Sequence, residues 1–148
     1  VLHHTPDCER AFRNLVRYLA PGGTMAIWVY AEDGGLWKKF SDFYRRYTVT
    51  MPPRLLHRLC QMAVPFYYLA KMPGIGRLLW TMAPISMHPN RAWRVLDTFD
   101  WYSPRYQSTH TYPEVYEWFR SEGLVSIRLM NVPVAVSGAR PWTGRDDA

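Results

Sequence analysis

The stretch TPDCERAFRNLVRYLAPGGTMAIWVY, residues 5–30, carries the signals of a helix, a tight turn and a buried strand in that order. Thr5 suits a helix cap and Pro6 suits the first helical position. Apolar residues then recur at helical spacing and form one face: Phe12, Leu15, Val16 and Leu19. Residues 21–23, PGG, end the helix, and the apolar run at 24–30 is too short for another. The pattern predicts half of a crossover unit in a parallel sheet.

The other half of this crossover unit is a strand before Thr5. Val1 and Leu2 are expected to be the last residues of that strand. The chain is therefore expected to begin inside a structural unit, as a fragment of a longer protein.

The composition indicates a folded domain. Apolar residues make up 48% of the 148 residues and aromatic residues 16%, which excludes a disordered chain. Cys8 and Cys60 have no C-x-x-C spacing, which indicates neither a disulfide framework nor a zinc cluster and fits a reducing compartment. The longest uncharged apolar run, 59–70, is too short to span a bilayer. We expect a cytoplasmic protein, soluble or peripheral to a membrane.

Charge is unevenly distributed along the chain. Residues 34–96 hold ten Lys or Arg and one acid, Asp42, for a net +9, whereas the remainder carries −3. The region 34–89 is also broken by prolines and reads as a helical insert or lid. Its first helix, from Leu36, is expected to be basic and amphipathic, with these side chains on one side: Trp37, Phe40, Tyr44 and Tyr47. An anionic partner is expected for this region.

The last third returns to alternating helix and strand signals. Asn90 can cap a helix over 91–99, and Thr111 with Glu114 forms a capping box. The helix after the capping box is expected to turn Val115, Trp118 and Phe119 inward and to end at Gly123. Residues 124–130 and 132–140 read as two strands of an antiparallel hairpin that docks on the 24–30 strand. The polar tail, 141–148, is expected to be frayed.

Four stretches together resemble the C-terminal half of a class I S-adenosylmethionine-dependent methyltransferase: VLHHTPD, RYLAPGGTMAIWVY, FDWYSPRYQSTHTYPEVYEWFRSEGL and VPVAVSGAR. The resemblance covers 1–33 and 90–140 and skips the insert. It implies an α/β fold, namely part of a Rossmann-like methyltransferase sheet ending in an antiparallel hairpin of the sixth and seventh strands. The glycine-rich loop and the acidic residue that hold the cofactor in this family have no counterpart in the sequence. The full-length protein is expected to be an enzyme that uses S-adenosylmethionine, and this fragment to be inactive.

The resemblance also implies site residues near the start of the chain. The loop there would face the methionyl group and the acceptor, with Val1, Leu2 and His3 near the cofactor. His3, His4 or His110 would act as the base or orient the acceptor, since imidazole titrates near neutrality. The alternative is that the histidines cap and pack their loop. The set His3, His4, Asp7 and Cys8 lacks a recognised ligand spacing, so no metal is expected.

Residues 97–111, DTFDWYSPRYQSTHT, are expected to form a loop that walls the acceptor pocket. Its candidate substrate-binding residues are Trp101, Tyr102, Tyr106 and Gln107. Aromatic walls with few polar groups suit a small-molecule acceptor. The alternative is that these aromatic residues anchor the loop on the core.

Three functions remain open at this point. The first is methyl transfer to a small lipophilic or anionic acceptor, with residues 34–87 meeting an anionic membrane surface. The second is a nucleic-acid methyltransferase, which the many Leu and Met residues of the insert and the absence of an NPPY-type tetrapeptide disfavour. The third is a non-enzymatic module that binds a membrane or a partner. A glycine-rich loop encoded upstream of Val1 would favour an enzyme.

Overall fold

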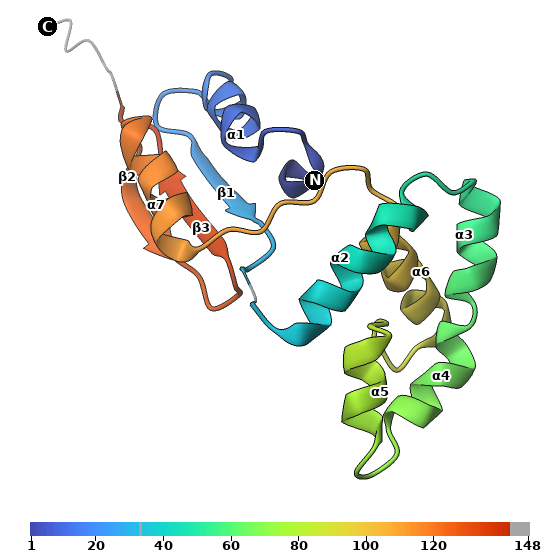
Figure 1. Cartoon of the computed structure of the whole chain (residues 1–148). Helices are drawn as coiled ribbons and strands as arrows, with labels where there is room; N and C mark the ends of the chain where they lie inside the picture. The colour runs from blue at the N-terminus through green and yellow to red at the C-terminus, as the bar shows by residue number, and fades with distance from the viewer. Residues whose placement is uncertain (33, 143–148) are drawn as a thin grey trace, which may run out of the picture. The chain divides into compact units, whose positions relative to one another are not determined.

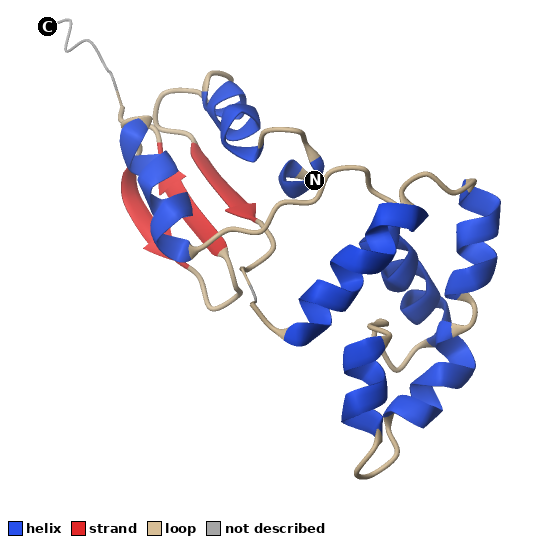
Figure 2. Cartoon of the chain, viewed as in Figure 1, coloured by secondary structure: helices blue, strands red, loops and turns tan. Residues whose placement is uncertain are grey.

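The computed structural model describes residues 1–32 and 34–142, which fall into two compact units of a mixed helix and strand structure (Figures 1 and 2). The sheet unit comprises Val1–Glu32 and Tyr106–Ala148, and the helical unit comprises Asp33–Arg105. Residues 90–105, which the sequence analysis grouped with the sheet, thus belong to the helical unit. Of the tail expected to be frayed, only Pro141 and Trp142 lie within the described residues.

The sheet unit consists of a small antiparallel sheet with helices packed on it. Its elements are η1 (Leu2–His4), α1 (Cys8–Val16), β1 (Thr24–Trp28), α7 (Tyr112–Ser121), β2 (Val125–Leu129) and β3 (Ala135–Ala139). The strand order is β1–β3–β2, and β1 pairs with β3 from Thr24 opposite Ala139 to Trp28 opposite Ala135. The expected C-terminal hairpin and its docking on β1 are therefore confirmed.

The expectation that β1 is a parallel strand is not confirmed in the part of the chain that the structure describes. β1 and β2 each pair antiparallel with β3, and the parallel contact is an isolated bridge between Ala31 and His110. Val1 and Leu2 do not end a strand either. Their carbonyl groups accept hydrogen bonds from the backbone N–H groups of His4 and Thr5, both at 3.0 Å. These bonds close a turn of 3-10 helix, η1, where the sequence predicts the end of a strand.

Helix α1 begins two residues later than the sequence analysis predicts. Asp7, and not Thr5, caps it, because the Asp7 carboxylate accepts a hydrogen bond from the Arg10 backbone N–H at 2.9 Å. The Thr5 hydroxyl instead donates to the Leu2 carbonyl at 2.7 Å. The helix also ends early, at Val16, and Leu15, expected on its apolar face, is exposed.

Helix α7 agrees with its sequence signals. Thr111 and Glu114 form the expected capping box, and Val115, Trp118 and Phe119 are buried. Gly123 ends the helix in the left-handed region, at φ 72°, which favours glycine. These predictions are confirmed.

One contiguous core holds the sheet unit together. Phe12 of α1 and Phe119 of α7 are fully buried, with ring centroids 4.8 Å apart. Val136 of β3 is also fully buried in the same cluster. Gly138 gives the Phe119 ring room, because a Cβ atom there would lie 2.7 Å from the ring atom Cδ1.

The helical unit is built from short helices separated by prolines and tight turns. They are α2 (Leu36–Thr48), α3 (Pro53–Cys60), α4 (Ala63–Ala70), α5 (Gly76–Met82) and α6 (Arg91–Tyr102). Asn90 caps α6 as expected, since its side chain accepts hydrogen bonds from the backbone N–H groups of Ala92 and Trp93. However, α6 runs to Tyr102, so the first part of the loop expected at 97–111 is helical. No helix in the described ranges is both long and apolar enough to cross a membrane.

Helix α2 buries two residues that are not among the four expected on one side. Ser41 and Arg45 are buried, whereas Tyr44 and Tyr47 are exposed. The Arg45 guanidinium donates to the carbonyl groups of Trp101 and Pro104, at 2.6 and 2.7 Å. A buried arginine of α2 thus satisfies backbone carbonyl groups at the end of α6, which the helix cannot satisfy itself.

Candidate functional site

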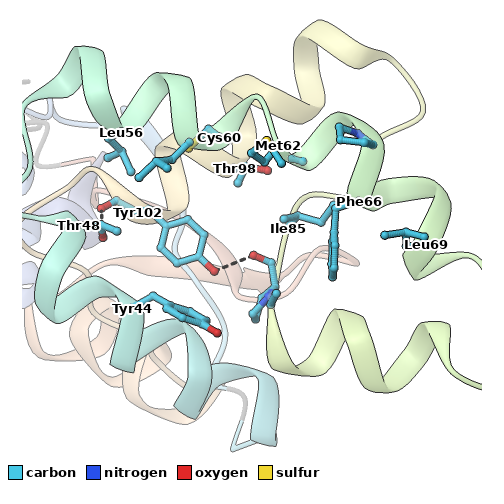
Figure 3. A pocket seen from close by; sticks show the side chains of 15 residues that line it. Tyr44, Thr48, Leu56, Cys60, Met62, Phe66, Leu69, Ile85, Thr98 and Tyr102 are labelled. Carbon is cyan, nitrogen blue, oxygen red and sulfur yellow. Dashed lines mark hydrogen bonds between the residues drawn. The ribbon is translucent and has the colours of Figure 1, made fainter.

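A cavity of about 410 Å³ lies within the helical unit (Figure 3). Residues of α2, α3, α4 and α6 and the segment after α5 line it. They are Tyr44, Thr48, Leu56, Leu59, Cys60, Met62, Ala63, Pro65, Phe66, Leu69, Ala83, Pro84, Ile85, Thr98 and Tyr102. No Lys, Arg, His, Asp or Glu belongs to this lining. The volume lies in the range of small-molecule pockets.

The hydroxyl groups in the cavity wall are bonded to backbone carbonyl groups. The Tyr102 hydroxyl donates to Pro84 at 2.7 Å, and the Thr48 hydroxyl donates to Tyr102 at 2.9 Å (Figure 3). The hydroxyl groups of Tyr44 and Thr98 donate to Met82 and Arg94 in the same way. Because these donors are used, the wall offers mainly carbon to a ligand.

The two ionisable groups buried in this wall are neutral at physiological pH. Burial raises the pKa of the Cys60 thiol to about 11. Burial likewise raises the pKa of the Tyr102 hydroxyl to about 12. A neutral thiol and a neutral phenol add no charge to the cavity, which therefore suits an uncharged, apolar ligand or ligand segment.

The expected acceptor wall is divided between the two units. Tyr102 lines the cavity, whereas Trp101 packs against the neighbouring cluster of Leu56, Cys60 and Tyr102. Tyr106 and Gln107 belong to the sheet unit. Most of the lining comes from the insert, where the sequence analysis placed no site residue. The available signal was a helical spacing of apolar residues, which three lining residues share: Leu56, Cys60 and Ala63.

The histidines at the start of the chain pack closely in the sheet unit. His3 is buried and stacks on Tyr30, with ring centroids 4.0 Å apart, and His4 meets His3 edge-on at 4.3 Å. Nδ1 of His4 lies 3.1 Å from the Tyr106 carbonyl oxygen. The His3 carbonyl accepts a hydrogen bond from the Ser108 N–H at 2.9 Å. These contacts support the packing interpretation of His3 and His4.

His110 lies in a hydrogen-bonded row of side chains. Its Nδ1 is 2.8 Å from Oε1 of Glu114, and its Nε2 is 2.8 Å from Oγ of Ser108. Its backbone N–H donates to the Tyr30 carbonyl, and its own carbonyl accepts from Glu32. Hydroxyl, imidazole and carboxylate in this order can transfer a proton. The two backbone hydrogen bonds fasten His110 to the segment that follows β1, and both ring nitrogens are held by neighbouring side chains.

Val1, Leu2 and His3 do not by themselves form a cofactor site. Leu2 packs against the core and His3 is buried under Tyr30, so only the exposed Val1 is available to a ligand. The fit of S-adenosylmethionine to these residues is therefore poor. Among the described residues, no group of three or more His, Cys, Asp or Glu side chains is placed to hold a metal ion.

Comparison with known proteins identified no relative of this chain. No family model, no curated protein and no solved structure matches the chain.

Proposed function

We propose that the chain is the C-terminal part of an S-adenosylmethionine-dependent methyltransferase whose helical unit binds a lipophilic small-molecule acceptor. In this proposal, the three-stranded sheet continues into a larger Rossmann-like sheet supplied by residues before Val1. The antiparallel hairpin of β2 and β3 beside β1 agrees with the end of such a sheet. The observation that carries the proposal is the uncharged cavity of about 410 Å³ in the insert.

The chemistry assigned to this chain is acceptor binding. Methyl transfer from a sulfonium is a direct displacement that depends on alignment and on excluding competing water. An apolar cavity contributes to both, because it orients a lipophilic acceptor and keeps water away from it. Since Val1, Leu2 and His3 fit the cofactor poorly, cofactor binding is not assigned to them.

The first experiment tests acceptor binding with the 148-residue chain. N-phenyl-1-naphthylamine, a neutral apolar fluorophore, is titrated and its emission recorded. The wild-type chain is expected to bind it at one saturable site. Leu59→Trp, which places an indole in the cavity, is expected to weaken binding about tenfold. Leu55→Trp is the matched control, since Leu55 lies one turn earlier on α3 with the same exposure and does not line the cavity.

Two outcomes of the titration contradict acceptor binding in the cavity. One is equal affinity of Leu59→Trp and the wild-type chain. The other is equal loss in both tryptophan variants, which would indicate a nonspecific effect of the added indole.

The second experiment tests methyl transfer with the complete gene product. Tritium from S-[methyl-³H]adenosylmethionine is expected in the organic phase when a total lipid extract serves as acceptor. The 148-residue chain alone is expected to show no micromolar binding of the cofactor by calorimetry. Label transferred to nucleic acid, or no transfer to lipid extract, would contradict the proposed acceptor class.

His3 and His110 remain candidate residues in this enzyme. If either acts on the acceptor, its replacement by Ala lowers kcat of the complete gene product and leaves cofactor affinity nearly unchanged. An unchanged kcat in both variants would mean that these histidines only pack in the sheet unit.

A further inference from the structure

The helical unit has a long stretch without any negative side chain. Residues 43–96 contain no Asp or Glu and eight basic residues. Arg45 and Arg94 are buried, and the other six are exposed: Arg46, Arg54, Arg58, Lys71, Arg77 and Arg91. A surface of this kind attracts anions over a distance of about 8 Å at physiological salt.

Apolar side chains at the opening of the cavity are exposed. Leu59 and Met62 line the cavity and are 48% and 64% exposed, and Leu69 of α4 lines it and is 48% exposed. These side chains both line the cavity and reach the surface, and Figure 3 labels Met62 and Leu69 among the lining residues. Large exposed apolar groups beside a pocket are typical of a surface that meets an apolar phase or a partner.

On α3 the charged and apolar groups lie side by side. Leu55 and Leu59 are one turn apart, and Met62 continues their line after the helix; Arg54 and Arg58 occupy the adjacent line. All five are exposed, while Leu56 and Cys60 on the opposite side are buried. We name these five residues the α3 mouth face. Basic and apolar side chains on one exposed face are typical of a helix that lies in a bilayer interface.

We infer that the α3 mouth face docks on an anionic lipid bilayer, so that a lipophilic acceptor enters the cavity directly from the lipid. The arginines meet the headgroups, and Leu55, Leu59 and Met62 enter the acyl boundary. The source of the acceptor rests on the proposed function. Docking itself is a separate property, because it depends on the α3 mouth face and not on methyl transfer.

The test is sedimentation of the 148-residue chain with lipid vesicles. Vesicles of phosphatidylcholine with about 30% phosphatidylglycerol are compared with pure phosphatidylcholine at two salt concentrations. Binding is expected only to the anionic vesicles and is expected to fall with added salt. Removing one basic contact weakens vesicle binding about fivefold. The affinity of the double variant Arg54→Glu, Arg58→Glu for anionic vesicles is therefore expected to fall at least 25-fold.

Matched controls separate this face from net charge. The double variant Arg10→Glu, Arg17→Glu makes the same change of charge at exposed residues of the sheet unit. It is expected to bind anionic vesicles as tightly as the wild-type chain does. Met62→Ser is expected to weaken binding about tenfold, whereas Leu96→Ser, an exposed apolar position on α6, is expected to leave it unchanged. Circular dichroism confirms that each variant is folded.

Three outcomes overturn the inference. These are no sedimentation with anionic vesicles, equal sedimentation with neutral vesicles, and equal losses in the Arg10, Arg17 control. Failure of docking is distinguishable from failure of the proposed function. Binding of N-phenyl-1-naphthylamine without binding of vesicles would contradict only the docking. Binding of vesicles without binding of the fluorophore would contradict only the acceptor site.

Discussion

The two units of this chain are stabilised in different ways. The sheet unit has one core in which Phe12, Phe119 and Val136 are fully buried. The helical unit has two small clusters, around Leu56 and around Tyr67, and a cavity beside them. Instead of a dense core, the helical unit has buried arginines bonded to backbone carbonyl groups.

This difference agrees with the roles proposed for the two units. A densely packed core holds its elements in one rigid arrangement, which suits a scaffold. A unit that keeps an apolar cavity gives up part of the dispersion energy that filling it would supply. Hydrogen bonds from guanidinium groups to carbonyl groups stabilise such a unit without filling the space that a ligand needs.

The largest expected effect is in the core of the sheet unit. Phe119→Ala removes a fully buried ring and is expected to lower the free energy of unfolding by about 4 kcal/mol. Urea unfolding followed by circular dichroism measures it. Tyr116→Ala, at an exposed position of the same helix, is expected to cost less than about 0.5 kcal/mol. A loss below about 1 kcal/mol in Phe119→Ala would contradict the single dense core.

A smaller but still large effect is expected at Arg94. This side chain is buried, and its Cζ atom lies 3.5 Å from the centroid of the Tyr67 ring. Its guanidinium donates hydrogen bonds to the carbonyl groups of His88 and Pro89, both at 3.0 Å. Arg94→Met leaves both carbonyl groups without this donor and is expected to cost about 3 kcal/mol.

Arg91→Met is the control for Arg94, since Arg91 is exposed at the start of the same helix. It is expected to change the free energy of unfolding by less than about 0.5 kcal/mol. Equal stabilities of the two variants would mean that buried arginines do not stabilise the helical unit.

A moderate effect is expected at Gly138. In Gly138→Ala the new Cβ atom would lie 2.7 Å from Phe119, so the ring or β3 must shift. The expected loss is about 1–2 kcal/mol by urea unfolding. Ser137→Ala, the adjacent position whose side chain points to the other face of the strand, is expected to cost less than about 0.5 kcal/mol. An unchanged free energy of unfolding in Gly138→Ala would show that β3 is packed less tightly against Phe119 than the structure indicates.

The last expected effect is a pH dependence at Cys60, which is absent at neutral pH and appears only above pH 9. Burial raises the pKa of this thiol from 9.0 to about 11. The folded state holds its proton where the unfolded state has lost it, so the stabilisation is complete below pH 9 and lost as the pH rises toward 11. Cys60→Ala is expected to flatten the fall in stability between pH 9 and pH 11. Identical slopes for the variant and the wild-type chain would contradict the burial of this thiol.

Much of the sheet unit could be predicted from its sequence. The capping box at Thr111, the stop at Gly123 and the C-terminal hairpin are local signals whose partners lie within a few residues. Even here a local competition reversed one prediction, because the Thr5 hydroxyl bonds to Leu2 and leaves the helix cap to Asp7.

The candidate site was harder to predict. The sequence predicts the acceptor wall at 97–111, and Tyr102 from that stretch does line the cavity. The rest of the wall comes mostly from helices of the insert, whose facing sides depend on how they pack. Leu55 and Leu59 are as apolar as Leu56, and only packing decides that Leu56 is the buried one.

The sequence by itself determined where many helices and strands of this protein begin and end, because caps, glycines and prolines act on their own neighbouring backbone. Only the tertiary structure decided which arginines are buried and where a cavity remains. Arg45 finds its acceptors 56 and 59 residues away, at Trp101 and Pro104. No pattern within a helix encodes such a partner, because burying a charge is favourable only once distant carbonyl groups have been brought to it.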